Sequence, residues 1–212
     1  MSVSMIKDFF EDRARRKSDE KENNRVVRME NGNSKKWGEL GIGDIIIVSQ
    51  GEDFPADVVI VDVSDGEKLA FVETKNLDGE TNLKSKICPT MPSGARLPQS
   101  LNGWSVQCEP PSEKIYQFNG VLSNGRGIEI GLGYDNFCLR GSSLRNTEFI
   151  VGIVTYTGND TKVMRNSVPS AQKQSKLEYE TGRYILYIFL VMIFLCFIAA
   201  IYIQILSRNM QV

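Results

Sequence analysis

The feature that most constrains this chain is an uncharged stretch from Tyr184 to Leu206, in which Gln204 is the only strongly polar residue. At ~1.5 Å per residue, a helix over this stretch is about 34 Å long, enough to cross a bilayer. Its 15 Ile, Leu, Phe and Val residues favour insertion, by about 5 to 9 kcal/mol at ~0.3 to 0.6 kcal/mol each. A soluble core helix is the alternative, but such helices are seldom apolar on every face. The pattern predicts a transmembrane helix over residues 184–206.

The charges on either side of this stretch predict its orientation. Lys173, Lys176 and Arg183 precede the span, whereas Arg208 alone follows it. Because basic residues collect on the cytosolic side of a span, we expect residues 1–183 to be cytosolic in an integral membrane protein. Residues 167–183 are expected to be a polar linker.

The N-terminal segment, residues 1–36, is predicted to be a membrane-proximal helical connector. Apolar residues recur at helical spacing between residues 3 and 22, with charged residues between them. A basic cluster in this helix consists of Arg13, Arg15, Arg16 and Lys17. It is either a solvated helix face or a contact to anionic lipid headgroups.

Residues 37–166 change to short apolar runs separated by Gly, Asn, Asp and Pro, which predicts a compact antiparallel β-domain. The expected strands are residues 45–48, 58–63, 69–73, 115–118, 128–130 and 149–156. Residues 88–112 are rich in Pro and are expected to form an irregular surface loop, and residues 161–166 a short helix. The glycine-rich pieces at 124–127 and 131–133 lack a Gly-Lys-Ser/Thr ending and are interpreted as hairpin turns.

Composition excludes several classes of function. The chain has no histidine, so Ser-His-Asp or Cys-His catalysis and His-ligated metals are excluded. Its four cysteines lie too far apart in sequence for a paired zinc motif, so no metal site is expected. Residues 37–90 carry 4 Lys/Arg against 11 Asp/Glu, which is the wrong sign for a nucleic-acid surface.

One short segment points to chemistry. Asp78-Gly79-Glu80-Thr81 lies between the apolar run at 69–73 and Leu83. Gly79 permits a positive φ, so the segment is predicted to be a tight turn that presents a carboxylate. On composition alone, a solvated strand connection is the simplest interpretation.

Matches along most of the chain change that interpretation. Residues 71–84 resemble the actuator-domain signature of P4-type ATPases, the lipid flippases. Further matches in the same order are Gly43-Asp44-Ile45, Pro55-Ala56-Asp57, Leu139-Arg140-Gly141, Leu144-Arg145-Asn146-Thr147 and Tyr156-Thr157-Gly158. The departures are residues 85–118, which match weakly, and Phe149, where the family often has Trp. The resemblance implies a mainly β fold with flanking helices, a distorted jelly-roll-like actuator domain followed by one transmembrane helix.

The resemblance also implies roles for residues. Glu80 would be the catalytic carboxylate that orients water at an aspartyl phosphate, with Asp78, Gly79 and Thr81 as the supporting turn. Asn82 and Lys84 would dock on the phosphorylation domain. Arg145 is open to two interpretations, a docking contact or an ion pair inside the β-domain.

At the level of the whole protein, the resemblance implies an ATP-driven phospholipid translocase that uses ATP and Mg²⁺ bound outside this segment. Expected partners are the phosphorylation and nucleotide domains of the same full-length chain, membrane phospholipid and a small accessory transmembrane subunit, with no nucleic acid. This segment alone would be inactive. The alternative is a non-enzymatic flippase-like module with a regulatory or scaffolding role. Cation pumps of the wider family typically carry Thr-Gly-Glu-Ser at the turn, which disfavours that branch.

Overall fold

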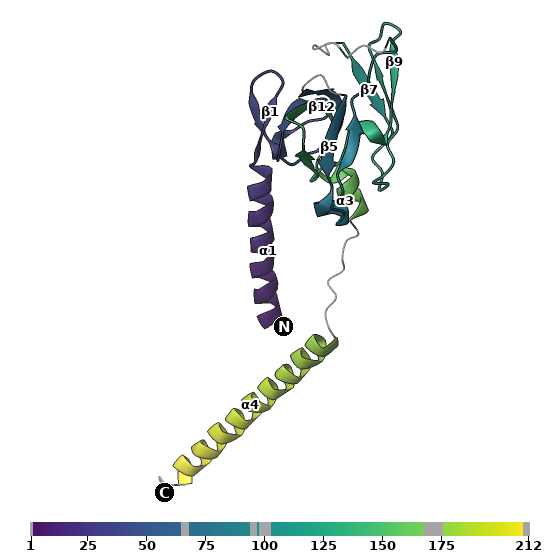
Figure 1. Cartoon of the computed structure of the whole chain (residues 1–212). Helices are drawn as coiled ribbons and strands as arrows, with labels where there is room; N and C mark the ends of the chain where they lie inside the picture. The colour runs from purple at the N-terminus through teal and green to yellow at the C-terminus, as the bar shows by residue number, and fades with distance from the viewer. Residues whose placement is uncertain (1, 65–67, 94–96, 98–102, 168–175, 210–212) are drawn as a thin grey trace. The chain divides into compact units, whose positions relative to one another are not determined.

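The computed structural model describes residues 2–64, 68–93, 97, 103–167 and 176–209. The chain divides into two units, residues 12–168 and residues 1–11 with 169–212. Figure 1 shows that the first unit is built mainly of strands and that a long helix, α4 (Lys176–Asn209), belongs to the second. The helix α1 (Ser2–Asn23) confirms the helix predicted for residues 3–22.

The described residues of the β-domain form three antiparallel sheets. The largest has six strands in the order β10-β4-β12-β3-β1-β2. Their bounds are Phe137–Cys138, Asp57–Val63, Phe149–Tyr156, Ile45–Ser49, Val26–Met29 and Ser34–Lys36. Two three-stranded sheets have the orders β11-β5-β6 and β7-β8-β9. Their bounds are Ser143–Arg145, Leu69–Glu73 and Lys84–Ile87 for the first, and Ser105–Cys108, Gly120–Ser123 and Glu129–Leu132 for the second.

Strand β4, which pairs with β10 on one side and β12 on the other, explains how these sheets pack. Successive side chains of a strand point to opposite faces, and β4 is apolar on both. Val58 and Ile60 join a buried cluster with Val72 of β5, whereas Val59 and Val61 join a second cluster with Leu122 of β8. Each small sheet therefore covers apolar residues from a different face of the large sheet. This arrangement agrees with the mainly β, distorted jelly-roll-like domain predicted from the sequence.

Short helical segments connect the strands. They are η1 (Trp37–Glu39), α2 (Lys75–Asp78), η3 (Tyr134–Asn136), η4 (Gly158–Asp160) and α3 (Lys162–Asn166). The helix α3 confirms the short helix predicted at 161–166. The turn between β8 and β9 is confirmed at residues 124–127, where Asn124 Oδ1 accepts hydrogen bonds from the backbone N–H groups of Arg126 and Ile128.

The structure corrects four expectations about the strands. Residues 115–118 are not a strand: residues 115–116 lie in a turn, and Phe118 is buried and stacks on Phe137 with ring centroids 4.2 Å apart. The loop expected at 88–112 contains strand β7, although residues 94–96 and 98–102 of it lie outside the described part. Gly131 and Leu132 belong to β9 rather than to a turn. The strands β1 and β2 lie within the range 1–36, where we expected a helical connector.

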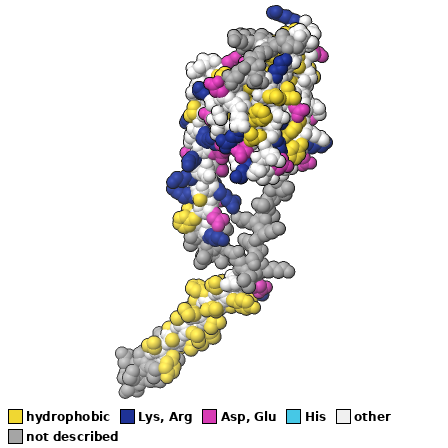
Figure 2. Space-filling view, viewed as in Figure 1, with side chains coloured by type: hydrophobic (Ala, Val, Ile, Leu, Met, Phe, Trp, Pro, Cys, Tyr) yellow, Lys and Arg dark blue, Asp and Glu magenta, His cyan; other side chains and the backbone are white. Residues whose placement is uncertain are grey.

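The helix α4 has the character of a membrane span. Its segment Glu180–Ile203 is long and apolar enough to cross a bilayer, and its side chains are exposed. Figure 2 shows this stretch as a nearly continuous apolar surface, whereas the visible β-domain surface mixes apolar and charged groups. The helix begins at Lys176, within the 167–183 segment interpreted as a linker, so the transmembrane helix predicted at 184–206 is part of a longer helix.

Candidate functional site

The candidate site begins where strand β5 ends. Residues 75–78 form the single helical turn α2, and Gly79 ends it with φ 75°, in the left-handed region. Glycine is the common residue at this position because it has no Cβ to clash in that conformation. Apart from its chain neighbours, no atom lies within 4 Å of the place where a Cβ would be, so the positive φ and not a close contact favours glycine here. The chain then leaves the helix as an exposed turn.

Asp78 organises the turn. Its Oδ1 accepts a hydrogen bond from the Glu80 backbone N–H at 2.9 Å, and its Oδ2 accepts one from the Thr74 hydroxyl at 2.9 Å. The Lys84 ammonium lies 2.5 Å from the same Oδ2. Burial works to raise the pKa of Asp78, but these hydrogen bonds, led by that of Lys84, outweigh it and lower the pKa to about 2. Asp78 is therefore ionised and holds the turn in place.

Glu80 is the most accessible carboxylate of the turn. Its side chain is 58% exposed, and its Oε2 lies 3.2 Å from Lys84 Nζ. The neighbouring Thr81 and Asn82 are exposed, and their side chains form no hydrogen bond with any residue that the structure describes. A carboxylate presented in this way can meet a group on another domain, orient a water molecule and accept a proton.

Lys84 is the basic residue of the turn. It begins strand β6, and its side chain is 21% exposed. Burial works to lower the pKa of Lys84, but hydrogen bonds to Asp78 and Glu80 outweigh it and raise the pKa above its usual value. Lys84 was expected to dock on a partner domain; in the structure its ammonium contacts the two carboxylates of its own turn.

Two tyrosines beside β6 were not anticipated from the sequence. Tyr116 lies close to Lys84, with the ammonium 5.1 Å from the ring centroid, and its hydroxyl lies 3.4 Å from Asp78 Oδ2. Tyr134 packs edge-on against Tyr116, with the two ring centroids 5.9 Å apart. The Lys86 ammonium lies over the Tyr134 ring, 3.5 Å from its centroid. Tyr116 belongs to the weakly matching segment 85–118 and was assigned to a strand, so no motif marked it.

Arg145 lies in β11 and pairs with Glu73 of the neighbouring strand β5, with Nε 2.9 Å from Glu73 Oε2. This ion pair is the second of the two interpretations left open by the sequence. The Arg145 side chain is 45% exposed. It is not among the groups that contact the carboxylates of the turn.

A second carboxylate, Asp57, is completely buried at the start of β4. It accepts hydrogen bonds from the backbone N–H groups of Arg140 at 2.8 Å and Lys162 at 2.7 Å. Burial raises the pKa of Asp57 to about 6, although these hydrogen bonds and the nearby positive charges work to lower it. Asp57 thus joins three segments of the chain that lie far apart in sequence.

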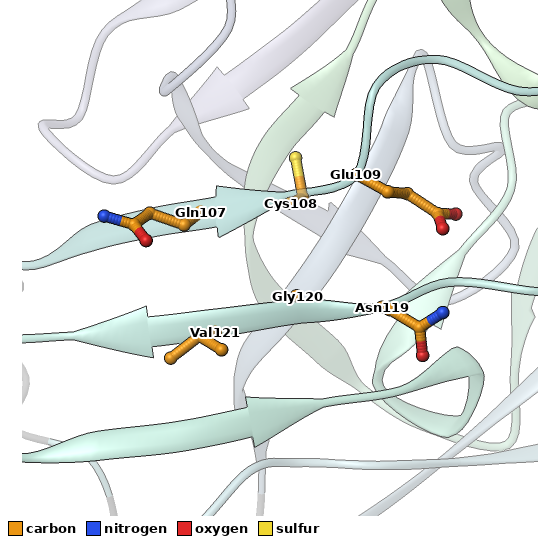
Figure 3. Close-up of a pocket in the computed structure, with 6 residues that line it drawn as sticks. All are labelled: Gln107, Cys108, Glu109, Asn119, Gly120 and Val121. Atoms are coloured by element: carbon orange, nitrogen blue, oxygen red, sulfur yellow. The ribbon is translucent and has the colours of Figure 1, made fainter.

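Other parts of the described surface offer less chemistry. A shallow hollow of about 390 Å³ lies on the β7–β8 pair, and Figure 3 shows that its six lining residues spread along the strands without converging. One of them, Glu109, forms an ion pair with the buried Lys162, with Oε1 2.9 Å from Lys162 Nζ. Among the described residues, no group of three or more His, Cys, Asp or Glu side chains is arranged to hold a metal ion.

Comparison with known proteins agrees with this geometry. The model of the P-type ATPase actuator domain matches residues 18–167, more than half of the chain. Phospholipid-transporting ATPase tat-1 of Caenorhabditis elegans is 37% identical over 205 residues, which cover 94% of this chain and 18% of that protein. Phospholipid-transporting ATPase 1 of Arabidopsis thaliana is 38% identical over 203 residues, or 93% and 17%. Phospholipid-transporting ATPase IC of Xenopus tropicalis is 38% identical over 199 residues, or 91% and 16%.

The chain thus spans less than a fifth of the length of these relatives. Each alignment covers more than nine-tenths of this chain, so the likeness extends beyond the matched domain. The domain match over residues 18–167, together with relatives 37–38% identical over more than nine-tenths of this chain, shows that this chain belongs to the P-type ATPase actuator domain family.

Proposed function

We propose that this chain is part of an ATP-driven phospholipid translocase of the P4 type, and that Glu80 performs the hydrolytic step of its cycle. Two kinds of observation support the proposal. The curated relatives bear the name phospholipid-transporting ATPase. The turn carries Asp78-Gly79-Glu80-Thr81 where cation pumps typically carry Thr-Gly-Glu-Ser. The observation that carries the proposal is the accessible Glu80 carboxylate on a turn fixed by Asp78.

The reaction follows from the chemistry of an acyl phosphate. In this mechanism an aspartate on the phosphorylation domain of the full-length chain carries the phosphoryl group. Glu80 orients a water molecule, whose oxygen attacks phosphorus as the bond between phosphorus and the aspartyl oxygen breaks, and Glu80 accepts the proton. Such general-base assistance typically contributes ~10² to 10⁴-fold in rate. Gly79 leaves the backbone open to the approaching phosphoryl group.

Other roles belong to the same proposal. Thr81 supports Glu80 or the phosphate, and Asn82 contacts the phosphorylation domain. Residues 1–183 are cytosolic, because the basic flank of the span lies on their side. ATP and Mg²⁺ act outside this segment, which is inactive alone, and a small accessory subunit completes the pump in the membrane.

The test is the Glu80→Gln variant in the full-length protein. Glutamine keeps the size of the side chain but cannot accept the proton, so the phosphoenzyme formed from ATP should accumulate and decay ~10²-fold more slowly or worse. The measurement is loss of labelled phosphate after a chase with unlabelled ATP. Lipid-stimulated ATP turnover should fall in parallel. If the variant lost phosphate at the wild-type rate, Glu80 would not be the hydrolytic carboxylate, and a non-enzymatic module would be the better description.

A further inference from the structure

The Lys84 ammonium bridges the two carboxylates of the turn. Its Nζ lies 2.5 Å from Asp78 Oδ2 and 3.2 Å from Glu80 Oε2. Strand β6 begins at Lys84, so the cation is anchored by the sheet, while Glu80 lies on the exposed connection before it. The position of the Glu80 carboxylate therefore depends on a side chain of the neighbouring strand as well as on Asp78.

Tyr116 holds the Lys84 ammonium through its ring. The ring centroid lies 5.1 Å from the cation, an attraction that depends on the negative face of the aromatic ring. Its hydroxyl reaches Asp78 Oδ2 at 3.4 Å, so one tyrosine contacts both ends of the Asp78–Lys84 ion pair. Tyr134 supports the ring edge-on at 5.9 Å. The nearby Lys86 ammonium fixes Tyr134 in turn by donating a hydrogen bond to its carbonyl oxygen at 2.8 Å.

The chemistry of the proposed reaction makes such a cation useful. Glu80 must approach a phosphoryl group that carries negative charge, and Asp78 brings a second negative charge close behind it. Like charges repel over this range, and a positive charge between or beside them offsets that repulsion by attracting both. Lys84 is only 21% exposed, so solvent screens it less than it would screen a lysine on the open surface.

We propose that Lys84 and Tyr116 are positioning residues for Glu80. Lys84 holds Asp78 and Glu80 together and moves with them toward the phosphorylated aspartate, where it offsets their repulsion with the phosphoryl group. Tyr116 fixes Lys84 in that place. This inference rests on the proposed hydrolytic role of Glu80. It differs from a docking role, in which Lys84 would leave the turn to contact the other domain.

The experiment follows phosphoenzyme decay in the full-length protein. Lys84→Met should slow decay ~10-fold or more, and Lys84→Arg should restore it to within ~3-fold of wild type, because arginine keeps the charge. Tyr116→Ala should slow decay ~3- to 10-fold. Lys75→Met is the matched control. Lys75 is exposed on the adjacent helical turn and forms no ion pair with a described residue, so the phosphoenzyme of this variant should decay at the wild-type rate.

A double-mutant cycle separates positioning from docking. If Lys84 acts through the turn, Lys84→Met should slow decay much less in an Asp78→Asn background than in the wild type. In that background the Asp78–Lys84 ion pair is already broken, so Lys84 no longer bridges the two carboxylates. Equal effects in both backgrounds would overturn the proposal in favour of docking. If Lys84→Met formed no phosphoenzyme, Tyr116→Ala, which leaves every charge in place, would decide. An unchanged decay in Tyr116→Ala would also overturn it.

The Glu80→Gln variant, measured alongside, keeps the two proposals distinguishable. Slow decay in Glu80→Gln with wild-type decay in Lys84→Met would leave the hydrolytic role intact and overturn only the positioning role. Wild-type decay in Glu80→Gln would overturn the hydrolytic role itself and, with it, the positioning role.

Discussion

Asp57 and the Asp78–Glu80 turn are two carboxylate-bearing regions of one β-domain with opposite designs. Asp57 is buried, and both of its oxygens accept hydrogen bonds from backbone N–H groups of distant segments. The turn is exposed, and its side-chain partners include a hydroxyl and the ammonium of Lys84. Backbone donors cannot move without moving the chain, whereas a lysine side chain can follow or release a carboxylate.

The difference separates a buried carboxylate that joins distant segments from a carboxylate that fixes an exposed turn. Burial raises the pKa of Asp57 to about 6, while hydrogen bonds led by that of Lys84 overcome burial and lower the pKa of Asp78 to about 2. The residue type is the same in both places, so burial and hydrogen bonding account for the opposite shifts in pKa. Four measurements test this contrast.

The largest expected effect is that of Asp57→Ala. It leaves the buried N–H groups of Arg140 and Lys162 without their acceptor, so the free energy of unfolding should fall by about 3 to 4 kcal/mol. Glu80→Ala, in the exposed turn, should change it by less than about 0.5 kcal/mol. Denaturant unfolding in detergent, followed by tryptophan fluorescence, reports on the β-domain because Trp37 and Trp104 both lie outside α4. Equal losses in the two variants would remove the contrast.

The pH dependence of stability should reflect both shifts. Because the folded pKa of Asp57 is raised to about 6, its contribution is full below the unfolded value of 3.8 and is lost as the pH rises through 6, a fall of about 2 to 3 kcal/mol. Asp78, with its pKa lowered to about 2, instead loses its contribution as the pH falls from 4 to 2. Stability should therefore peak near pH 4. Asp57→Asn should abolish the fall between pH 4 and 6 and keep the fall below 4.

Gly152→Ala tests how tightly the region around Asp57 is packed. A Cβ at Gly152 of β12 would clash with the side chain of Val58, the residue after Asp57. The variant should lose about 2 kcal/mol of unfolding free energy through overpacking. Gly133→Ala is the control, because that glycine has extended backbone and no atom within 4 Å of the place that the added methyl group would occupy. Tolerance of alanine at Gly152 would show that β4 and β12 can separate.

Gly79→Ala tests the turn in the same way and should have the smallest effect. Space is free at Gly79, so only the positive φ opposes a side chain, at a cost of about 1 kcal/mol. Gly79→Asn should cost less, because asparagine tolerates the left-handed region better. A loss larger than that of Gly152→Ala would mean that the turn is more constrained than the buried strand pair.

The sequence predicted the parts of the fold whose patterns are local. The strand at 69–73 and the strand at 149–156 have the predicted bounds, because their apolar residues and flanking turns are unambiguous. Strand β7 was missed because Ser105–Cys108 is mostly polar and lies among prolines. The apolar run at 115–118 was wrongly predicted to be a strand. Phe118 is buried there because it stacks on Phe137, a contact between segments far apart in sequence.

In the candidate site, too, the residues marked by local sequence were predictable and the contacts made by tertiary packing were not. Asp78, Gly79 and Glu80 were predictable because adjacent residues form the turn, and a family motif marks them. The contact of Tyr116 with Lys84 joins residues 32 positions apart in sequence, and nothing local identifies it. Such a pairing follows from the tertiary packing that brings β6 and the chain before β8 together.

In a bilayer, the tyrosines of α4 would fix the depth of the helix. Tyr184 and Tyr187 lie near the start of its apolar segment, and Tyr202 lies near the other end. Tyr184 and Tyr202 are about 27 Å apart along the axis, close to the thickness of the hydrocarbon layer. Tyrosine favours the boundary between lipid tails and headgroups. Sliding α4 by one helical turn in a bilayer would move a tyrosine hydroxyl at one end into the hydrocarbon layer, and the cost of burying that polar group would oppose motion of the helix along its own axis.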